Sequence, residues 1–169
     1  MINVEQLWRW RSYGVGRRTT FISPNYSVGK AGYIMVKIIL GVKGTGKTKT
    51  LIDMVNSTAQ ASAGSVVCIE QGEKLRYDVS YQVRLVNTAE YSVADAQSLY
   101  GFIAGIHASN HDITHIFVDS ALKVAGNDMA AFDKFLAEAD SFCTANNIDL
   151  VMTVSLPVEQ ASETIKKFI

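Results

Sequence analysis

The chain has 169 residues, of which 48% are hydrophobic and 19% charged, and its formal net charge is zero. This balance is typical of one globular domain with a sizeable core, and it argues against a cationic nucleic-acid surface spread over the whole protein. No apolar run approaches the roughly 18 residues that a membrane span needs. The two cysteines, Cys68 and Cys143, stand far apart in apolar stretches, so we expect reduced core thiols in a cytoplasmic protein.

Residues 1–34 differ from the rest of the chain in charge and pattern. Against the single acid Glu5 they hold five basic residues: Arg9, Arg11, Arg17, Arg18 and Lys30. Because they lack helical or strand periodicity and contain several glycines, we expect a basic, poorly ordered N-terminal extension. Three interpretations stay open: a tail that contacts an anionic partner through arginines and Trp8 or Trp10, an organelle-targeting segment, or sequence upstream of a true start at Met35.

From residue 35 onward, strand-like and helix-like segments alternate. Five segments have the composition of strands: 35–40, 66–70, 82–87, 113–119 and 148–154. Four have apolar residues at helical spacing: 47–61, 92–109, 128–146 and a terminal helix after Pro157. Residues 71–81 show no clear pattern. The alternation predicts a single α/β domain over 35–169, layered around a mostly parallel central sheet.

A glycine-rich segment follows the first predicted strand directly. Its eight residues match the pattern G-x-x-x-x-G-K-[ST] at every fixed position: Gly41, Val42, Lys43, Gly44, Thr45, Gly46, Lys47 and Thr48. The glycines tolerate positive φ, so successive backbone N–H groups can point at one anion. Lys47 adds a charge for the β- and γ-phosphates, Thr48 offers a hydroxyl to Mg²⁺, and the next helix contributes its positive dipole end. The segment predicts a binding site for a nucleoside triphosphate.

A bound triphosphate also needs a metal, so a carboxylate is expected at the end of a buried strand that lies beside the first strand. Asp119 ends the apolar run at 116–118 and is the candidate Mg²⁺ ligand together with Thr48. The alternative interpretation is a carboxylate that caps the following turn.

Hydrolysis requires a further group that positions or polarises water in line with the γ-phosphate. Many ATPases carry a glutamate directly after the metal-binding aspartate, but Ser120 stands there in this chain. Glu70, at the end of the second strand, and Glu73, just beyond it, are candidates for the missing carboxylate. With Lys47 they form the candidate catalytic set. The competing interpretation is that both glutamates contact solvent or a basic side chain.

Other polar residues at strand ends have weaker signals. Thr153 and Ser155, at the end of the last strand, are candidates for sensing a γ-phosphate, with an ordinary structural role as the alternative. Arg76 and Arg84 are candidates for stabilising phosphate charge across a subunit contact. Surface solvation or ion pairing is the alternative for both arginines.

Over about residues 35–155 the chain resembles the RecA-like branch of P-loop NTPases. The resemblance lies in the loop GVKGTGKT, in the strand VVCIEQGE that ends in an acid, and in the strand IFVDS, where serine follows aspartate. It implies a three-layer P-loop fold, ATP as the ligand, and a catalytic glutamate at Glu70 or Glu73. The chain is also similar to small uncharacterised bacterial single-domain ATP-binding proteins.

The leading functional hypothesis is a Mg²⁺-dependent ATP-binding protein with slow or partner-stimulated ATPase activity. It would act through nucleotide-dependent conformational change or assembly, with itself or with a protein partner. A second hypothesis is a nucleoside-type kinase: Arg76-Tyr77 is similar to a pair in type II thymidine kinases, although their glutamate after the aspartate and their cysteine-built zinc lobe are missing. A third is a nucleotide-dependent interaction module without turnover. ATP is favoured over GTP because N-K-x-D and D-x-x-G motifs are missing.

Overall fold

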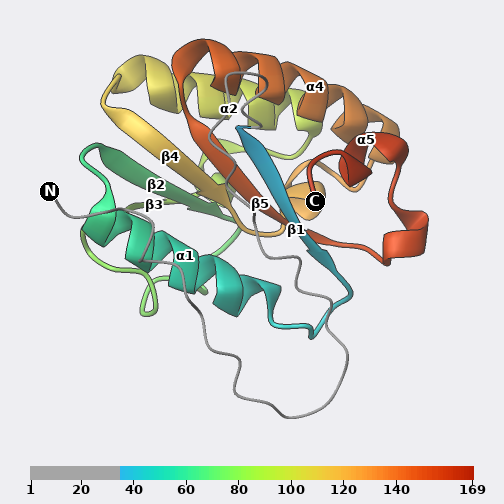
Figure 1. Ribbon diagram of the computed structural model, residues 1–169, viewed down its shortest axis with the longest axis horizontal. Coiled ribbons are helices and arrows are strands. Elements are labelled where there is room, and N and C mark those ends of the chain that lie inside the picture. Colours follow the sequence, from blue (N-terminus) through green and yellow to red (C-terminus); the bar gives the residue numbers. More distant parts are fainter. Residues whose placement is uncertain (1–34) are drawn as a thin grey trace, which may run out of the picture. The chain divides into compact units, whose positions relative to one another are not determined.

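A computed structural model describes residues 35–169, which belong to one compact unit built on a five-stranded sheet (Figure 1). The expectations for residues 1–34 lie outside the described residues. The sheet order is β1-β5-β4-β2-β3 and every pairing is parallel. The strands are β1 (Val36–Gly41), β2 (Ser65–Glu70), β3 (Arg84–Asn87), β4 (Ile113–Val118) and β5 (Asp149–Ser155).

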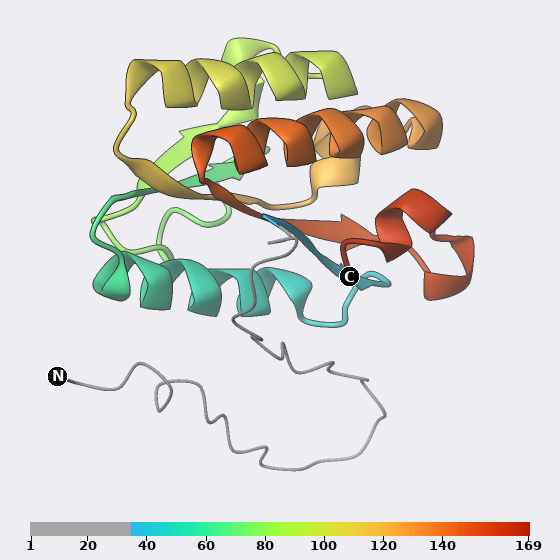
Figure 2. The same cartoon turned by 45° about the horizontal axis from the view of Figure 1, so that its top comes forward.

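Helices cover both faces of this sheet. Helix α1 packs on one face, and α2 and α4 pack on the other (Figure 2). The helices are α1 (Lys47–Ala61), α2 (Ala96–Ser109), α3 (Ala121–Val124), α4 (Met129–Asn146) and α5 (Glu163–Lys166), with 3₁₀ turns η2 (Thr88–Tyr91) and η3 (Val158–Gln160). The predicted three-layer α/β arrangement with a parallel sheet is therefore confirmed. Within 35–169, no helix is both long and apolar enough to span a membrane.

Each face of the sheet has its own hydrophobic core. On one side, Leu51 and Val55 of α1 pack with Cys68 of β2 and Phe117 of β4. The larger core on the other side is formed by α2, α4 and the opposite faces of the strands, and Phe132 is fully buried in it. Because both faces are covered, β2 and β4 are near-continuous apolar runs rather than alternating ones, as a parallel sheet requires.

Both cysteines are free thiols with no exposed surface, as the sequence predicts. Burial raises the pKa of Cys68 to about 12, and the negative charges of Glu70 and Asp119 add to the effect. Burial likewise raises the pKa of Cys143 to about 12, with smaller contributions from Asp140 and Asp149. Both therefore remain protonated core side chains at neutral pH.

The start of α2 differs from the prediction. The predicted helix began at residue 92, whereas α2 begins at Ala96 and is preceded by the turn η2. Asp95 causes this shift, because its carboxylate accepts a hydrogen bond from Ser98 N at 2.7 Å while the Ser98 hydroxyl accepts one from Asp95 N. Such a capping box fixes a helix start that apolar spacing alone does not mark.

The end of the chain also differs from the prediction. The expected continuous terminal helix is divided into η3 and α5, separated by the extended residues Ala161 and Ser162. Ser162 caps α5 by accepting from Ile165 N at 3.1 Å, and its hydroxyl donates to Asp133 of α4 at 2.6 Å. Of the apolar residues after Pro157, Ala161 and Ile165 are buried and Phe168 is partly buried against the larger core, whereas Val158 is 57% exposed.

The packing predicts a large loss of stability when the main core is emptied. We expect Phe132→Ala to lower the free energy of unfolding by about 3–5 kcal/mol, because a fully buried ring leaves a cavity. Chemical denaturation followed by circular dichroism measures the change. Tyr81→Ala is the matched control, since that ring is 95% exposed and its loss should change stability little. Equal stability of the two variants would contradict the assignment of this core.

Candidate functional site

The segment from Gly41 to Thr48 connects the end of β1 to the start of α1. Gly44 and Gly46 have φ of 88° and 82°, a left-handed conformation that glycine adopts at little cost. Gly46 is the N-cap of α1, and no side chain caps the helix there. The first N–H groups of α1 thus lack a side-chain acceptor at the positive end of the helix dipole, an arrangement that suits an anion.

Lys47 is folded inward against this segment. Only 8% of the residue is exposed, and its Nζ donates to the carbonyl oxygen of Val42 at 2.8 Å. The hydroxyl of Thr45 donates to the same oxygen at 2.8 Å. Burial lowers the pKa of Lys47, and the negative charge of Asp119 opposes that shift. The Lys47 ammonium group therefore lies within the loop, close enough to Asp119 to interact with its charge.

Asp119, directly after β4, collects hydroxyl donors from three parts of the chain. Its Oδ1 accepts from Thr48 Oγ1 of α1 at 3.0 Å and from Thr153 Oγ1 of β5 at 2.9 Å. Its Oδ2 accepts from the hydroxyl of Ser120 at 3.1 Å. The structure thus brings together the two predicted metal ligands, Thr48 and Asp119, which are 71 residues apart in sequence. The expected adjacency of their strands is wrong, because β5 lies between β1 and β4. We call Thr48, Asp119, Ser120 and Thr153 the hydroxyl–carboxylate cluster.

The donor set of this cluster fits Mg²⁺. Two ligands on adjacent corners of an octahedron with bonds of about 2.1 Å lie about 3 Å apart. The oxygens of Thr48 and Asp119 are 3.0 Å apart and belong to a hydroxyl and a carboxylate, which are hard donors. Both side chains are only partly buried, so water could complete the coordination of a metal.

The backbone after Asp119 is held in an unusual conformation. Ser120 has a φ of 55°, in the left-handed region that few residues other than glycine adopt. Its N–H donates to Thr153 Oγ1 at 2.7 Å, so one hydroxyl serves both the strained turn and the carboxylate. Thr153 is 1% exposed. Ser155, the other sensor candidate, is exposed and lies opposite Gly41 in the β1–β5 register.

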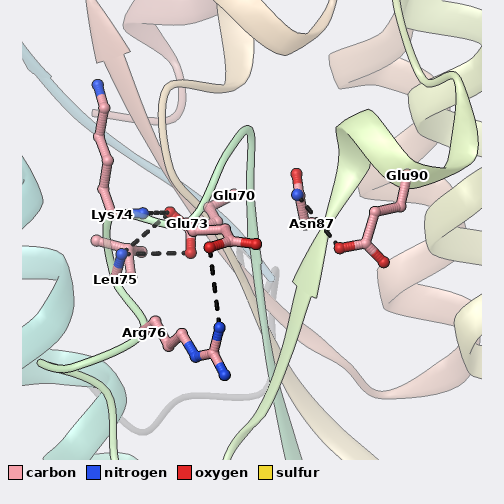
Figure 3. Close-up of polar contacts among 7 residues, drawn as sticks. All are labelled: Glu70, Glu73, Lys74, Leu75, Arg76, Asn87 and Glu90. Atoms are coloured by element: carbon pink, nitrogen blue, oxygen red, sulfur yellow. Dashed lines mark hydrogen bonds and ion pairs between the residues drawn. The ribbon is translucent and has the colours of Figure 1, made fainter.

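Glu70 ends β2, beside β4, and is 3% exposed. Its carboxylate accepts hydrogen bonds from Lys74 N at 2.9 Å and from Leu75 N at 3.1 Å (Figure 3). Burial raises the pKa of Glu70; the two backbone hydrogen bonds act against this, and the charges of Asp119 and Glu73 act with it. Within residues 35–169, no basic side chain forms an ion pair with Glu70, and the residue is almost inaccessible to solvent, so neither partner considered from the sequence applies. The Glu70 carboxylate instead stabilises the turn that follows β2, by accepting its backbone N–H groups.

Glu73 lies apart from the hydroxyl–carboxylate cluster. Its side chain is 68% exposed and pairs with Arg76 at 3.8 Å, as the competing interpretation of the sequence expected. Arg84 is exposed at the start of β3 and forms no ion pair with another residue of 35–169. The structure therefore does not bring either arginine into the cluster around Asp119.

Two features of this site were missed by sequence reasoning. The link from Thr153 to Ser120 N was not foreseen, and nor was the hold of Glu70 on the turn after β2. For the link to Ser120, the signal in the sequence was the position of Thr153 at the end of the last predicted strand. No signal in the sequence indicated the role of Glu70. No protein-family model and no curated protein matches the sequence.

The buried carboxylate of Glu70 generates a stability prediction. Glu70→Ala removes the acceptor of two backbone N–H groups and should lower the free energy of unfolding by about 1–3 kcal/mol. Glu70→Gln keeps one oxygen that can accept both N–H groups, so it should cost less. Thermal and urea denaturation of both variants measures the difference.

A comparison of the wild type with Glu70→Gln tests the pKa of Glu70. A raised folded-state pKa means that the glutamate contributes most to stability below its ordinary pKa of 4.5 and that this contribution is lost as pH rises through the folded value. The stability of wild type relative to Glu70→Gln should therefore fall as pH increases from 4.5. A difference that stays constant, or grows with pH, would contradict the raised pKa.

Proposed function

We propose that this protein binds a nucleoside triphosphate, ATP in particular, together with Mg²⁺. The observation that carries the proposal is the contact between Thr48 and Asp119 at the base of the glycine-rich turn. The turn offers backbone N–H groups and an uncapped helix start to phosphate, and the contact places two metal-type oxygens beside them. Either feature alone is common, whereas the two together match what a charged triphosphate requires.

Lys47 and the glycine turn have distinct roles in this proposal. The Lys47 ammonium group exchanges the Val42 carbonyl for phosphate oxygens, which are stronger acceptors. The backbone N–H groups of the turn and of the first turn of α1 bind the remaining phosphate oxygens. Thr48 and Asp119 hold the metal, which neutralises phosphate charge. Thr153 and Ser120 keep the Asp119 carboxylate oriented toward Thr48.

Hydrolysis is proposed to be slow or to need a partner. Ser120 cannot act as a general base, and both oxygens of Glu70 already accept backbone N–H groups. Glu73 lies on the surface in a weak ion pair. Activation of water would therefore require Glu70 to leave the turn or a residue from another molecule to enter, as in a nucleotide-dependent assembly.

The occupied oxygens of Glu70 also favour a second candidate function. A protein that binds ATP and Mg²⁺ without turnover could use the nucleotide only to change its shape or its association with partners. This candidate differs from a slow ATPase in one measurable property, the release of phosphate at saturating nucleotide.

Nucleotide binding is tested through Lys47. We expect Lys47→Ala to weaken Mg²⁺-dependent ATP binding by at least about tenfold, because charge-assisted hydrogen bonds to phosphate are lost. Isothermal titration with and without Mg²⁺ measures this loss. Lys49→Ala is the matched control, since Lys49 is exposed on the same helix and should not affect binding. Unchanged affinity of a folded Lys47→Ala variant would refute the proposal.

Turnover is tested by phosphate release at saturating ATP. If Glu70 is the base, Glu70→Gln should lower the rate by about 10²-fold or more, whereas Glu73→Gln should change it little. No effect of either variant on a measurable rate would remove both glutamates as candidate bases. No measurable rate in the wild type would favour the non-hydrolysing module. Formation of ADP without phosphate, only when a nucleoside is added, would instead identify a kinase.

A further inference from the structure

A cavity of about 320 Å³ runs along β3, from Arg84 at its start to the turn after its carboxyl end, and borders the carboxyl end of β2 at Glu70. After β2 the chain turns to the face that α1 covers, where Leu75 joins the smaller core. After β3 it turns to the opposite face, where Val93 and α2 join the larger core. Neighbouring parallel strands whose connections leave toward opposite faces open a crevice between them, and ligands of open α/β sheets bind in such crevices.

This crevice is bridged by hydrogen bonds at its base. The carbonyl oxygen of Asn87, on its side chain, accepts from Gly72 N at 2.9 Å and from Ala89 N at 3.1 Å, so it joins the loops that follow the two strands. The buried hydroxyl of Thr88 donates to the backbone oxygen of Glu70 at 3.1 Å. These contacts join the segments that border the cavity to one another, and small-molecule sites are usually largely pre-formed.

Five charged side chains line the cavity, and most of them are already engaged. Glu70 accepts two backbone N–H groups, and Glu73 pairs with Arg76 (Figure 3). The remaining two have no ion pair with any residue of 35–169: the cation Arg84 and the anion Glu90. Within 35–169, Glu90 accepts a single hydrogen bond, a long one of 3.3 Å from the side-chain nitrogen of Asn87. Arg84 and Glu90 are therefore the two lining charges, one of each sign, that no ion pair or backbone hydrogen bond within 35–169 compensates.

We propose that this crevice binds a small zwitterion of the amino-acid type, with its carboxylate on Arg84 and its ammonium group on Glu90. A ligand of this class supplies a partner to both uncompensated charges. A phosphate monoester would instead add two negative charges beside three carboxylates. Tyr91, whose ring is 57% exposed and lies 5.3 Å from that of Phe102, provides an apolar wall for a side chain at the rim.

The crevice site does not depend on nucleotide binding, although it borders the proposed nucleotide site. Glu70 lines the cavity and its carboxylate is close enough to Asp119 for their charges to interact. A ligand bound in the crevice would lie against the turn after β2, which the Glu70 carboxylate stabilises. The site is therefore placed to couple a small ligand to the hydroxyl–carboxylate cluster.

The experiment measures binding of the standard α-amino acids to the full chain at millimolar concentration, by saturation-transfer NMR and then by titration. Each amino acid that binds is compared with its analogue lacking the amino group and its analogue lacking the carboxylate. We expect both analogues to bind at least about tenfold more weakly, since each loses a charged hydrogen bond. Arg84→Ala and Glu90→Gln should each weaken binding of the amino acid by a similar factor.

The exposed ion pair of Lys134 and Glu138 on α4 supplies matched controls. Lys134→Ala and Glu138→Gln make the same charge changes away from the crevice and should leave binding unchanged. Absence of binding by every amino acid overturns the proposal, as does equal binding of an amino acid and its two analogues. Equal effects of crevice and control variants also overturn it. Lys47→Ala should still bind the amino acid, so failure of ATP binding and failure of this proposal are separate outcomes.

Discussion

The arrangement of residues at the carboxyl ends of the strands depends on the carboxylate of Asp119. A partly buried carboxylate is stable only with hydrogen-bond donors around it, and Asp119 obtains three hydroxyls, from α1, β5 and its own turn. Because β5 lies between β1 and β4, Thr153 reaches Asp119 and also holds the N–H of Ser120. One acidic side chain thereby fixes the start of α1, the end of β5 and a left-handed turn relative to one another.

Local patterns in the sequence predict most of the fold because they report local properties. Apolar spacing placed all five strands and the three long helices, and the bounds of α1 are those expected. Patterns fail where a distant contact decides the conformation. Residues 71–81 show no clear pattern in the sequence, since their conformation depends on Glu70 and on Asn56 of α1. The Asn56 side chain donates to Asp78 O and accepts from Ser80 N, both at 2.8 Å.

The candidate site likewise has a part that the sequence predicts and a part that distant contacts decide. A parallel sheet brings the carboxyl ends of its strands to one edge, so the sequence predicts that the glycine-rich turn and Asp119 lie at the same edge. The sequence does not predict the order of the strands. That order decides which side chains lie between the glycine-rich turn and Asp119. Glu70 and Glu73 looked equivalent as strand-end acids, yet one is buried on two backbone N–H groups and the other is exposed beside Arg76.

The position of Glu70 gives the carboxyl edge a further property. Its backbone oxygen accepts from Thr88 after β3, its carboxylate accepts from the turn after β2, and the charge of Asp119 acts on it. Burial and the neighbouring carboxylates oppose its ionised form, whereas the two N–H groups favour it. A change at Asp119, such as neutralisation by a cation, would remove one of the charges that oppose ionised Glu70. The hold of Glu70 on its turn should strengthen in response, so events at the hydroxyl–carboxylate cluster would reach the β2–β3 crevice through a single side chain.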